Sequence, residues 1–355
     1  MVLYFLEKVN CQETGESRVN NDLILLGHGS GGRLSHQLLD ELIIPALSCG
    51  GPADQNDAAL LDAPSGRLAY TTDSYVIDPI FFPGGNIGDL AVNGTVNDLA
   101  MMGAKPLWMS VGLILEEGFS KKELVTILAS MRRASDIAGV RIVTGDTKVV
   151  PRGKADRIFI NTSGIGVIEH GLDIHGANAR SGDAVIINGT LADHGIAVMA
   201  AREGLAVDAG IASDSAPLYG LVAEIIAEAG ESLHVLRDPT RGGVATTTKE
   251  IAMQSAVSIT LDEQALPVGL PVRGVCSLLG VDPLYVANEG KLLAFIAAEA
   301  AERTLARIKR HPLGAGAALI GFVSAADAGL VLMKTADGVM KIVEMLAGNR
   351  LPRIC

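Results

Sequence analysis

Short apolar runs alternate with segments of helical periodicity along most of the chain. Runs rich in Val, Ile and Leu predict strands, and apolar positions that recur every three to four residues predict helices. The predicted strands cover residues 23–26, 68–72, 108–115, 141–144, 158–167, 184–188, 284–287, 292–296, 317–323 and 329–333. The predicted helices cover residues 34–43, 87–102, 120–138, 194–203, 216–229, 244–254 and 299–309. Strands that alternate with helices in this way predict an α/β (α+β) protein.

A change in composition divides this pattern into two halves. Residues 169–182 are rich in Gly, Ala, Asn and Ser, which is typical of a linker. The length of 355 residues allows two domains, each with its own core. We therefore expect an N-terminal extension (1–22), an N-terminal α/β domain (23–170), a C-terminal α/β domain (171–346) and a mobile tail (347–355).

The charge and the cysteines exclude several classes of protein. The net charge is −11 and no run of Lys or Arg occurs, so neither nucleic acid nor an anionic membrane is an expected partner. The cysteines are scattered without a CxxC motif, which argues against a zinc site and a disulfide framework. Neither a signal-peptide pattern nor an uninterrupted apolar stretch of about 18 residues occurs. A cytoplasmic protein is the expectation.

A glycine-rich turn follows the first predicted strand. The segment Gly27-His-Gly-Ser-Gly-Gly32 lies between that strand and a predicted helix. The backbone N–H groups of such a turn can surround an anion such as a phosphate group, here from Gly29, Ser30, Gly31 and Gly32. The turn matches neither the Walker A pattern nor G-x-G-x-x-G, and a plain flexible turn fits it equally well.

Aspartates recur beside the ends of apolar strands and helices. They are Asp57, Asp73, Asp98, Asp146 and Asp238. Each alone fits a helix cap or a turn. Carboxylates that share one site repel each other, and a divalent cation stabilises them. Since Mg²⁺ prefers a few carboxylates together with phosphate oxygens, the set predicts binding of Mg-ATP.

Two further residues have plausible chemical roles and plausible structural ones. Lys148 lies two residues after Asp146 and could act as a point charge on a phosphoryl group, or be an ordinary surface lysine. Glu289 lies between Asn288 and Gly290 and could act as a general base, or be a turn residue.

The sequence ends on Cys355. A terminal residue is tethered on one side only, so its side chain can move relative to the rest of the protein. A thiolate is a strong nucleophile that can carry an acyl group. Pro352 favours an extended chain just before it. The sequence therefore indicates either a mobile carrier thiol or a frayed end whose thiol has no function.

Several motifs together resemble one protein family. They are His28-Gly-Ser-Gly-Gly32, Thr72-Asp-Ser-Tyr-Val-Ile-Asp-Pro79, Asn93-Gly-Thr-Val-Asn-Asp98, Thr144-Gly-Asp-Thr-Lys-Val149, Arg237-Asp-Pro-Thr-Arg-Gly-Gly243, Asn288-Glu-Gly-Lys291 and Pro352-Arg-Ile-Cys355. They are similar to the motifs of the HypE family of hydrogenase maturation factors, within the aminoimidazole ribonucleotide synthetase-like (PurM-like) superfamily. The resemblance runs from about Gly27 to the last residue, whereas residues 1–22 resemble nothing that we can place.

The resemblance implies a fold and a reaction. The fold is a two-domain aminoimidazole ribonucleotide synthetase-like fold, with an ATP cleft between the domains and N-terminal sheets that pair across a homodimer. The reaction is the ATP-dependent dehydration of a carbamoyl group on the terminal cysteine to a thiocyanate. The implied partners are the carbamoyltransferase HypF, which loads the cysteine, and the HypC–HypD scaffold, whose iron receives the cyanide.

The resemblance also implies roles for individual residues. Cys355 would carry the carbamoyl group, Glu289 would remove protons from its nitrogen, and Lys148 or Arg241 would stabilise the transferring phosphoryl group. The implied Mg²⁺ ligands are Asp57, Asp73, Asp98 and Asp238, with Asp146 as a further one. The implied nucleotide contacts are Gly29, Ser30, Gly31, Gly32, Asn97, Thr147 and Lys148.

Other functions fit parts of the sequence. Selenophosphate synthetase and thiamine-phosphate kinase share the expected ATP cleft, but the former would need a Cys near the glycine turn, where this chain has His28-Gly-Ser30. A non-catalytic carrier that binds nucleotide only to move its tail fits too, and ATP hydrolysis that depends on a loaded Cys355 would separate it from an enzyme. A metal-storage protein has no support, since His and Cys are not clustered.

Overall fold

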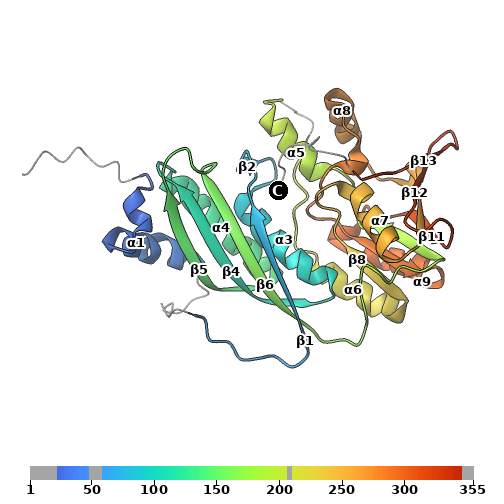
Figure 1. Cartoon of the computed structure of the whole chain (residues 1–355), viewed down its shortest axis with the longest axis horizontal. Helices are drawn as coiled ribbons and strands as arrows, with labels where there is room; N and C mark the ends of the chain where they lie inside the picture. The colour runs from blue at the N-terminus through green and yellow to red at the C-terminus, as the bar shows by residue number, and fades with distance from the viewer. Residues whose placement is uncertain (1–21, 48–57, 206–209, 346–355) are drawn as a thin grey trace, which may run out of the picture.

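The computed structural model describes residues 22–47, 58–205 and 210–345 (Figure 1). The described part contains a four-stranded sheet that ends at Ile168 and a seven-stranded sheet that begins at Asp183. The two sheets therefore lie on either side of the Gly-rich residues 169–182. No helix in the described ranges has the length and the apolar character needed to cross a membrane.

The four-stranded sheet forms the N-terminal half. Its strand order is β1 (Arg67–Tyr75), β6 (Ile158–Ile168), β4 (Lys105–Glu116) and β5 (Arg141–Val150). Strands β4 and β5 are parallel, and the other neighbours are antiparallel. Helices α3 (Ile87–Met101) and α4 (Lys121–Ala138) cover one face of the sheet, and the hairpin of β2 (Phe81–Phe82) and β3 (Gly85–Asn86) precedes α3 (Figure 1).

Helix α3 is buried on almost every side, because the sheet, α4 and the second domain all pack against it. Asn86 caps its first turn by accepting a hydrogen bond from the Gly88 N–H at 2.8 Å. Thr162 of β6 bonds to the Ala91 carbonyl at 3.2 Å and to the Thr95 hydroxyl at 2.5 Å. These buried bonds fix the position of α3 on the sheet.

The opposite face of this sheet carries exposed apolar side chains. Alternation along β1 turns Leu68 and Tyr70 away from α3, and they are 59% and 69% exposed. Ile165 on β6 and Trp108 on β4 lie in the same cross-strand row as Tyr70. Ile114 of β4 is also exposed on this side. We call this surface the open face of the sheet.

The seven-stranded sheet forms the C-terminal half. Its order is β13 (Met340–Ile342), β12 (Val331–Lys334), β9 (Ser258–Asp262), β11 (Ala318–Ser324), β7 (Asp183–Ile187), β10 (Leu293–Ala297) and β8 (Leu233–Arg237). The helices are α5 (Asp193–Arg202), α6 (Tyr219–Ala229), α7 (Gly243–Gln254), α8 (Leu270–Leu279) and α9 (Ala298–Ile308). Alternate residues of β7 enter two apolar clusters, one with α6 and α9 and the other with α5 and α7. The strand is therefore buried throughout and apolar from Ala184 to Ile187.

An irregular segment, residues 210–218, joins the two halves; we call it the strap. The Ser213 N–H donates to the Pro83 carbonyl at 2.7 Å, next to the β2–β3 hairpin. Asn97 of α3 accepts from the Leu218 N–H at 2.8 Å and donates to the Ala216 carbonyl at 3.0 Å. The strap thus ties the start of α6 to α3.

Some predicted elements are wrong, for identifiable reasons. Residues 23–26 do not form a strand; η1 (Leu26–Gly29) begins there, and the His28 ring accepts from the Leu25 N–H at 2.8 Å. Residues 284–287 do not form a strand either. The 3₁₀ helix η5 (Pro283–Tyr285) starts there, because Asp282 caps it and Pro283 fits its first position.

Other boundaries moved, or were missed. Strand β5 does not end at Thr144 as predicted but continues to Val150, through the Thr144–Val149 motif. Strand β1 extends past Asp73 to Tyr75. The segment predicted as one helix over 34–43 is α1 (Arg33–Leu38), η2 (Leu39–Ile43) and α2 (Ile44–Leu47). Strands β9 and β13 and helix α8 were not predicted. Ser120 caps α4, since its hydroxyl accepts from the Glu123 N–H at 3.5 Å.

Candidate active site

An acidic pocket lies where the two halves meet. Its volume is about 70 Å³, and its lining comes from β1, α3, the loop after β8 and the loop before β10. The lining residues are Asp73, Ser74, Tyr75, Gly94, Asp98, Asp238, Thr240, Arg241 and Glu289. The structure therefore brings together five of the residues singled out from the sequence: Asp73, Asp98, Asp238, Arg241 and Glu289.

The two aspartates of the N-terminal half are held by hydroxyl groups. The Thr71 hydroxyl donates to Asp98 Oδ2 at 2.7 Å, and the Tyr75 hydroxyl donates to Asp73 Oδ2 at 3.2 Å. Tyr75 fits only because residue 94 is glycine; a Cβ there would lie 2.2 Å from the tyrosine oxygen. Sequence reasoning gave Tyr75 no role, although it lies in a quoted motif.

The acidic residues of the C-terminal half lie on two loops that Asn288 joins. The fully buried Asn288 donates from Nδ2 to the Pro239 carbonyl at 2.9 Å, next to Asp238. The following residue, Glu289, is 4% exposed, and its Oε1 has no hydrogen-bond partner among the described residues. An unpartnered carboxylate oxygen is costly to bury, which indicates a group that a ligand completes.

The carboxyl groups in the pocket disfavour one another's charge. Burial, then the charges of Asp238 and Asp73, raise the pKa of Asp98 to about 7. Burial also raises the pKa of Asp238 to about 6, with Asp73 adding to the rise. Burial and then the neighbouring carboxylates, led by Asp238, raise the pKa of Glu289 well above its ordinary value. The pocket therefore favours a bound cation.

The oxygen ligands in the pocket suit Mg²⁺, with other ligands needed to complete its shell. No three Asp, Glu, His or Cys side chains in the described ranges converge closely enough to hold a metal ion themselves. Mg²⁺ in proteins usually keeps waters and phosphate oxygens as ligands beside one or two carboxylates. Asp73, Asp98 and Asp238 line the pocket and would share such an ion with those other ligands; Asp57 lies outside the described residues.

A second group of the predicted residues lies apart from the acidic pocket, on edge strand β5. Lys148 Nζ lies 2.8 Å from Asp146 Oδ2, and both side chains are exposed. The hydrogen bond from Lys148 lowers the pKa of Asp146. Thr147 lies between them, and Gly29 packs against Val149 so closely that a Cβ would lie 2.6 Å from the Val149 nitrogen. The glycine turn and β5 therefore form one group.

The sheet register gives the separation of the two groups. Asp73 on β1 pairs with Thr162, which pairs with Val111, which pairs with Gly145 on β5. Three strand spacings put the level of Asp73 roughly 14 Å from β5. Asp146, the next residue, points to the open face, away from α3. One chain therefore does not bring Asp146, Thr147 or Lys148 to the acidic pocket.

The glycine turn uses some of its own polar groups. The Ser30 hydroxyl donates to the Gly27 carbonyl at 2.9 Å, and the Gly31 N–H donates to the Ser35 hydroxyl at 2.9 Å. Gly32 is the N-cap of the six-residue helix α1. The turn is therefore compact, and the N–H of Gly31 is already paired.

Asn97 lies beneath the acidic pocket and does not line it. Its amide donates to the carbonyls of Ala216 and Glu289, each at 3.0 Å, and accepts from Leu218. The side chain is 1% exposed. Asn97, which was predicted to contact the nucleotide, therefore joins α3 to the strap and to the Glu289 loop. Cys355 lies outside the described residues.

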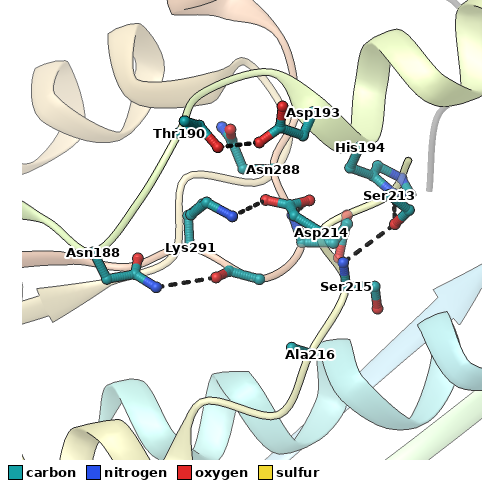
Figure 2. Close-up of polar contacts among 12 residues, drawn as sticks. Asn188, Thr190, Asp193, His194, Ser213, Asp214, Ser215, Ala216, Asn288 and Lys291 are labelled. Carbon is teal, nitrogen blue, oxygen red and sulfur yellow. Dashed lines mark hydrogen bonds and ion pairs between the residues drawn. The ribbon is translucent and has the colours of Figure 1, made fainter. Parts of the chain in front are cut away.

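Sequence reasoning also missed the residues behind Glu289. Asp214 on the strap and Lys291 form a buried ion pair (Figure 2), and Asp214 also accepts a hydrogen bond from the Glu289 N–H. Lys291 belongs to the quoted Asn288–Lys291 motif, which could have drawn attention to it. Asp214 lies in an irregular stretch without periodicity, so no sequence signal distinguished it.

Comparisons with known proteins match both halves of the chain. The family model of the AIR synthase related protein, N-terminal domain, matches residues 55–168, and that of the C-terminal domain matches residues 180–333. The carbamoyl dehydratase HypE of Rhizobium leguminosarum bv. viciae is 53% identical over 95% of this chain and 96% of its own length.

Solved structures resemble most of the chain as well. The crystal structure of a hydrogenase maturation protein HypE in complex with ATP is 51% identical, with a TM-score of 0.89 over 93% of this chain and 99% of the other. The HypE chain of a HypE–HypF complex is 47% identical, with a TM-score of 0.77 over 87% of this chain and 99% of the other.

Proposed function

The chain belongs to the HypE family of AIR synthase related proteins, and on that premise we propose that it is an ATP-dependent carbamoyl dehydratase. It dehydrates a carbamoyl group carried on its own Cys355 to a thiocyanate, the source of the cyanide ligands of a NiFe-hydrogenase iron centre. The observation that carries the proposal is the acidic pocket between the two halves of the chain. The chain itself is 53% identical to a carbamoyl dehydratase.

The proposed reaction balances without an oxidant or a reductant. The oxygen of the S-carbamoyl group bonds to the γ-phosphoryl group of ATP, and ADP leaves. The bond between that oxygen and the carbamoyl carbon then breaks, and the oxygen departs within phosphate. The nitrogen loses both of its protons, and a carbon–nitrogen triple bond remains on the sulfur. Phosphorylation is needed because an unmodified amide oxygen is a poor leaving group.

Glu289 is the proposed acceptor of a proton from the carbamoyl nitrogen. It lines the pocket, and its unpartnered Oε1 is available to an N–H group of the substrate. Burial raises its pKa, which makes the ionised carboxylate a stronger proton acceptor. Arg241, exposed at the edge of the pocket, would stabilise charge on the phosphoryl group. Mg²⁺, held by Asp73, Asp98 and Asp238, would neutralise phosphate charge.

We also propose that the glycine turn, Asp146, Thr147 and Lys148 of one chain act at the acidic pocket of a second copy, across a homodimer. Within one chain, Lys148 lies on the opposite edge and the opposite face of the sheet from the acidic pocket. The open face between them carries exposed apolar side chains that a second copy would cover. Pairing of two open faces would bring the glycine turn, Asp146, Thr147 and Lys148 of one copy towards the acidic pocket of the other.

Tyr70→Asp is expected to convert a dimer into monomers. A buried carboxylate on each open face would oppose association, and the affinity for Mg-ATP should fall together with the dimer fraction. Sedimentation velocity and calorimetry measure the two quantities. The matched control is Ile137→Asp, which adds the same charge at an exposed apolar position on α4 and should leave both unchanged. A wild-type monomer, or a dimeric Tyr70→Asp variant, would refute the proposed pairing.

The partners and the location follow from the same proposal. A carbamoyltransferase of the HypF type would load Cys355, and a scaffold of the HypC–HypD type would receive the cyanide. The HypE–HypF complex of a related chain supports the first of these partners. A cytoplasmic location is proposed, since a carrier thiol must stay reduced.

Mass spectrometry of the C-terminal peptide tests the proposed reaction. After incubation with the carbamoyltransferase, carbamoyl phosphate and ATP, the peptide is expected to gain a carbamoyl group and then to lose the mass of one water. A loaded peptide that never loses water would favour the non-catalytic carrier instead. A kinase of the thiamine-phosphate type would leave the peptide unmodified.

A further inference from the structure

A buried ion pair between Asp214 and Lys291 (Figure 2) lies against the loop that carries Glu289. Lys291 Nζ is 2.7 Å from Asp214 Oδ2, and the two side chains are only 10% and 7% exposed. Gly189 gives the lysine stem its space, since a Cβ there would lie 2.9 Å from Lys291 Cε. The pair joins the strap to the residue that follows the Glu289–Gly290 peptide.

The second oxygen of Asp214 binds the backbone of the same loop. Its Oδ1 accepts from the Glu289 N–H at 3.3 Å. Between these two bonds, Gly290 lies against the strap so closely that a Cβ would be 1.8 Å from the Asp214 carbonyl oxygen. Asp214 therefore holds the loop on both sides of Gly290 and leaves residue 290 no space for a side chain.

The other contacts of this loop come from fixed elements. The Glu289 carbonyl accepts from Asn97 of α3 at 3.0 Å, and the Gly290 carbonyl accepts from Asn188 at 3.2 Å. The strap itself is bound to α3 and to the β2–β3 hairpin. The backbone of Glu289 is thus held between the strap and α3, while its Oε1 has no partner among the described residues.

We propose that Asp214 and Lys291 are positioning residues that hold the Glu289 carboxylate at the carbamoyl nitrogen. This inference rests on the proposed function. Neither residue lines the acidic pocket, so each acts through Glu289. Replacing a buried ion pair with apolar residues of similar volume is often neutral for stability. The ion pair therefore need not stabilise the fold. Its bonds to both sides of Gly290 instead hold the Glu289 loop in position.

The test uses a variant in which both partners change, Asp214→Leu with Lys291→Met, so that neither partner is left as a buried charge without the other. The variant is expected to stay folded and to keep the KM for ATP of the wild type, because Asp73, Asp98 and Asp238 are untouched. Its kcat for thiocyanate formation should fall about 100-fold, the effect of a displacement of about 1 Å at a reacting group. A kcat equal to that of the wild type would overturn the inference.

A double-mutant cycle shows whether the pair acts through Glu289. In a Glu289→Gln background, the paired substitution should change kcat by about two-fold or less, because the group that it positions is already removed. If the paired substitution lowered kcat by the same factor in the Glu289→Gln background as in the wild type, the inference would be overturned. If Glu289→Gln alone leaves kcat unchanged, the inference and the role of Glu289 both fall. Thiocyanate formation by the wild type separately decides the proposed function.

The matched control is another buried pair in the same domain. Asp183 and His234 lie 2.9 Å apart and are 2% and 7% exposed, at the starts of β7 and β8. Asp183→Asn weakens a buried pair that has no contact with the Glu289 loop. This variant should lose stability and keep kcat within about two-fold of the wild type. An equal loss of kcat would show a general loosening of the domain and would overturn the positional role.

Discussion

Replacing Cys355 by Ala is expected to abolish thiocyanate formation while the affinity for Mg-ATP stays that of the wild type. The thiol is the only group proposed to hold the carbamoyl substrate, so its loss leaves nothing to dehydrate. Cys355 lies outside the described residues. The proposed Mg²⁺ ligands Asp73, Asp98 and Asp238 are unchanged in this variant, so nucleotide binding should persist. Phosphate release in the presence of the carbamoyltransferase, together with calorimetry for Mg-ATP, measures both quantities.

Cys276 supplies the matched control. It is a free, buried cysteine on α8, and burial raises its pKa to about 11, so its thiol is a poor nucleophile. Cys276→Ala should therefore reduce stability and leave thiocyanate formation intact. If the Cys355→Ala protein still supported hydrogenase maturation, the carrier role of the terminal thiol would be wrong.

Asp98→Asn is expected to lower the affinity for Mg-ATP by about 100-fold or more, because the cation loses an anionic ligand. The amide oxygen of the new side chain could still accept the bond from Thr71, so the fold should be retained. The affinity of the wild type should itself fall between about pH 8 and about pH 6. Without a cation, Asp98 has a pKa of about 7, so at the lower pH a proton competes with Mg²⁺.

The control for this prediction, Asp89, lies about two and a half turns earlier in the same helix. Burial raises the pKa of Asp89 as well, but this carboxyl group accepts from the Asn86 N–H at the start of α3 and does not line the acidic pocket. Asp89→Asn should change stability and leave Mg-ATP affinity unchanged. If the Asp98→Asn and wild-type proteins bound Mg-ATP with equal affinity, the acidic residues would be helix caps and turn residues and not metal ligands.

The sequence contained much of the acidic pocket, because its residues follow a local rule. Asp73, Asp98, Asp238 and Glu289 each lie beside an apolar element and within a motif, so a polar residue stands out there. The prediction that these residues converge rested on the family resemblance, since no local pattern tells which loops meet. Asp214 was missed for that reason: its partner Lys291 is 77 residues away and the strap has no periodicity.

The end of β5 shows why a strand boundary was misplaced. Gly145 and Asp146 are disfavoured in strands, so the prediction stopped at Thr144. In the structure, pairing with β4 outweighs this preference and continues to Val150. Gly145 is needed there, because a Cβ would lie 2.5 Å from the Val111 carbonyl oxygen. A strand, and not a loop, therefore holds Asp146 and Lys148 at the sheet edge.

The separation of the two groups of residues across one sheet has a consequence for genetics. In the homodimer proposed above, a gene copy that carries Asp98→Asn and another that carries Lys148→Ala would each encode a protein impaired in every site. In a mixed dimer, one site would collect both defects and the other would have neither. Two defective alleles expressed together in one cell should then restore part of the hydrogenase activity that each alone lacks.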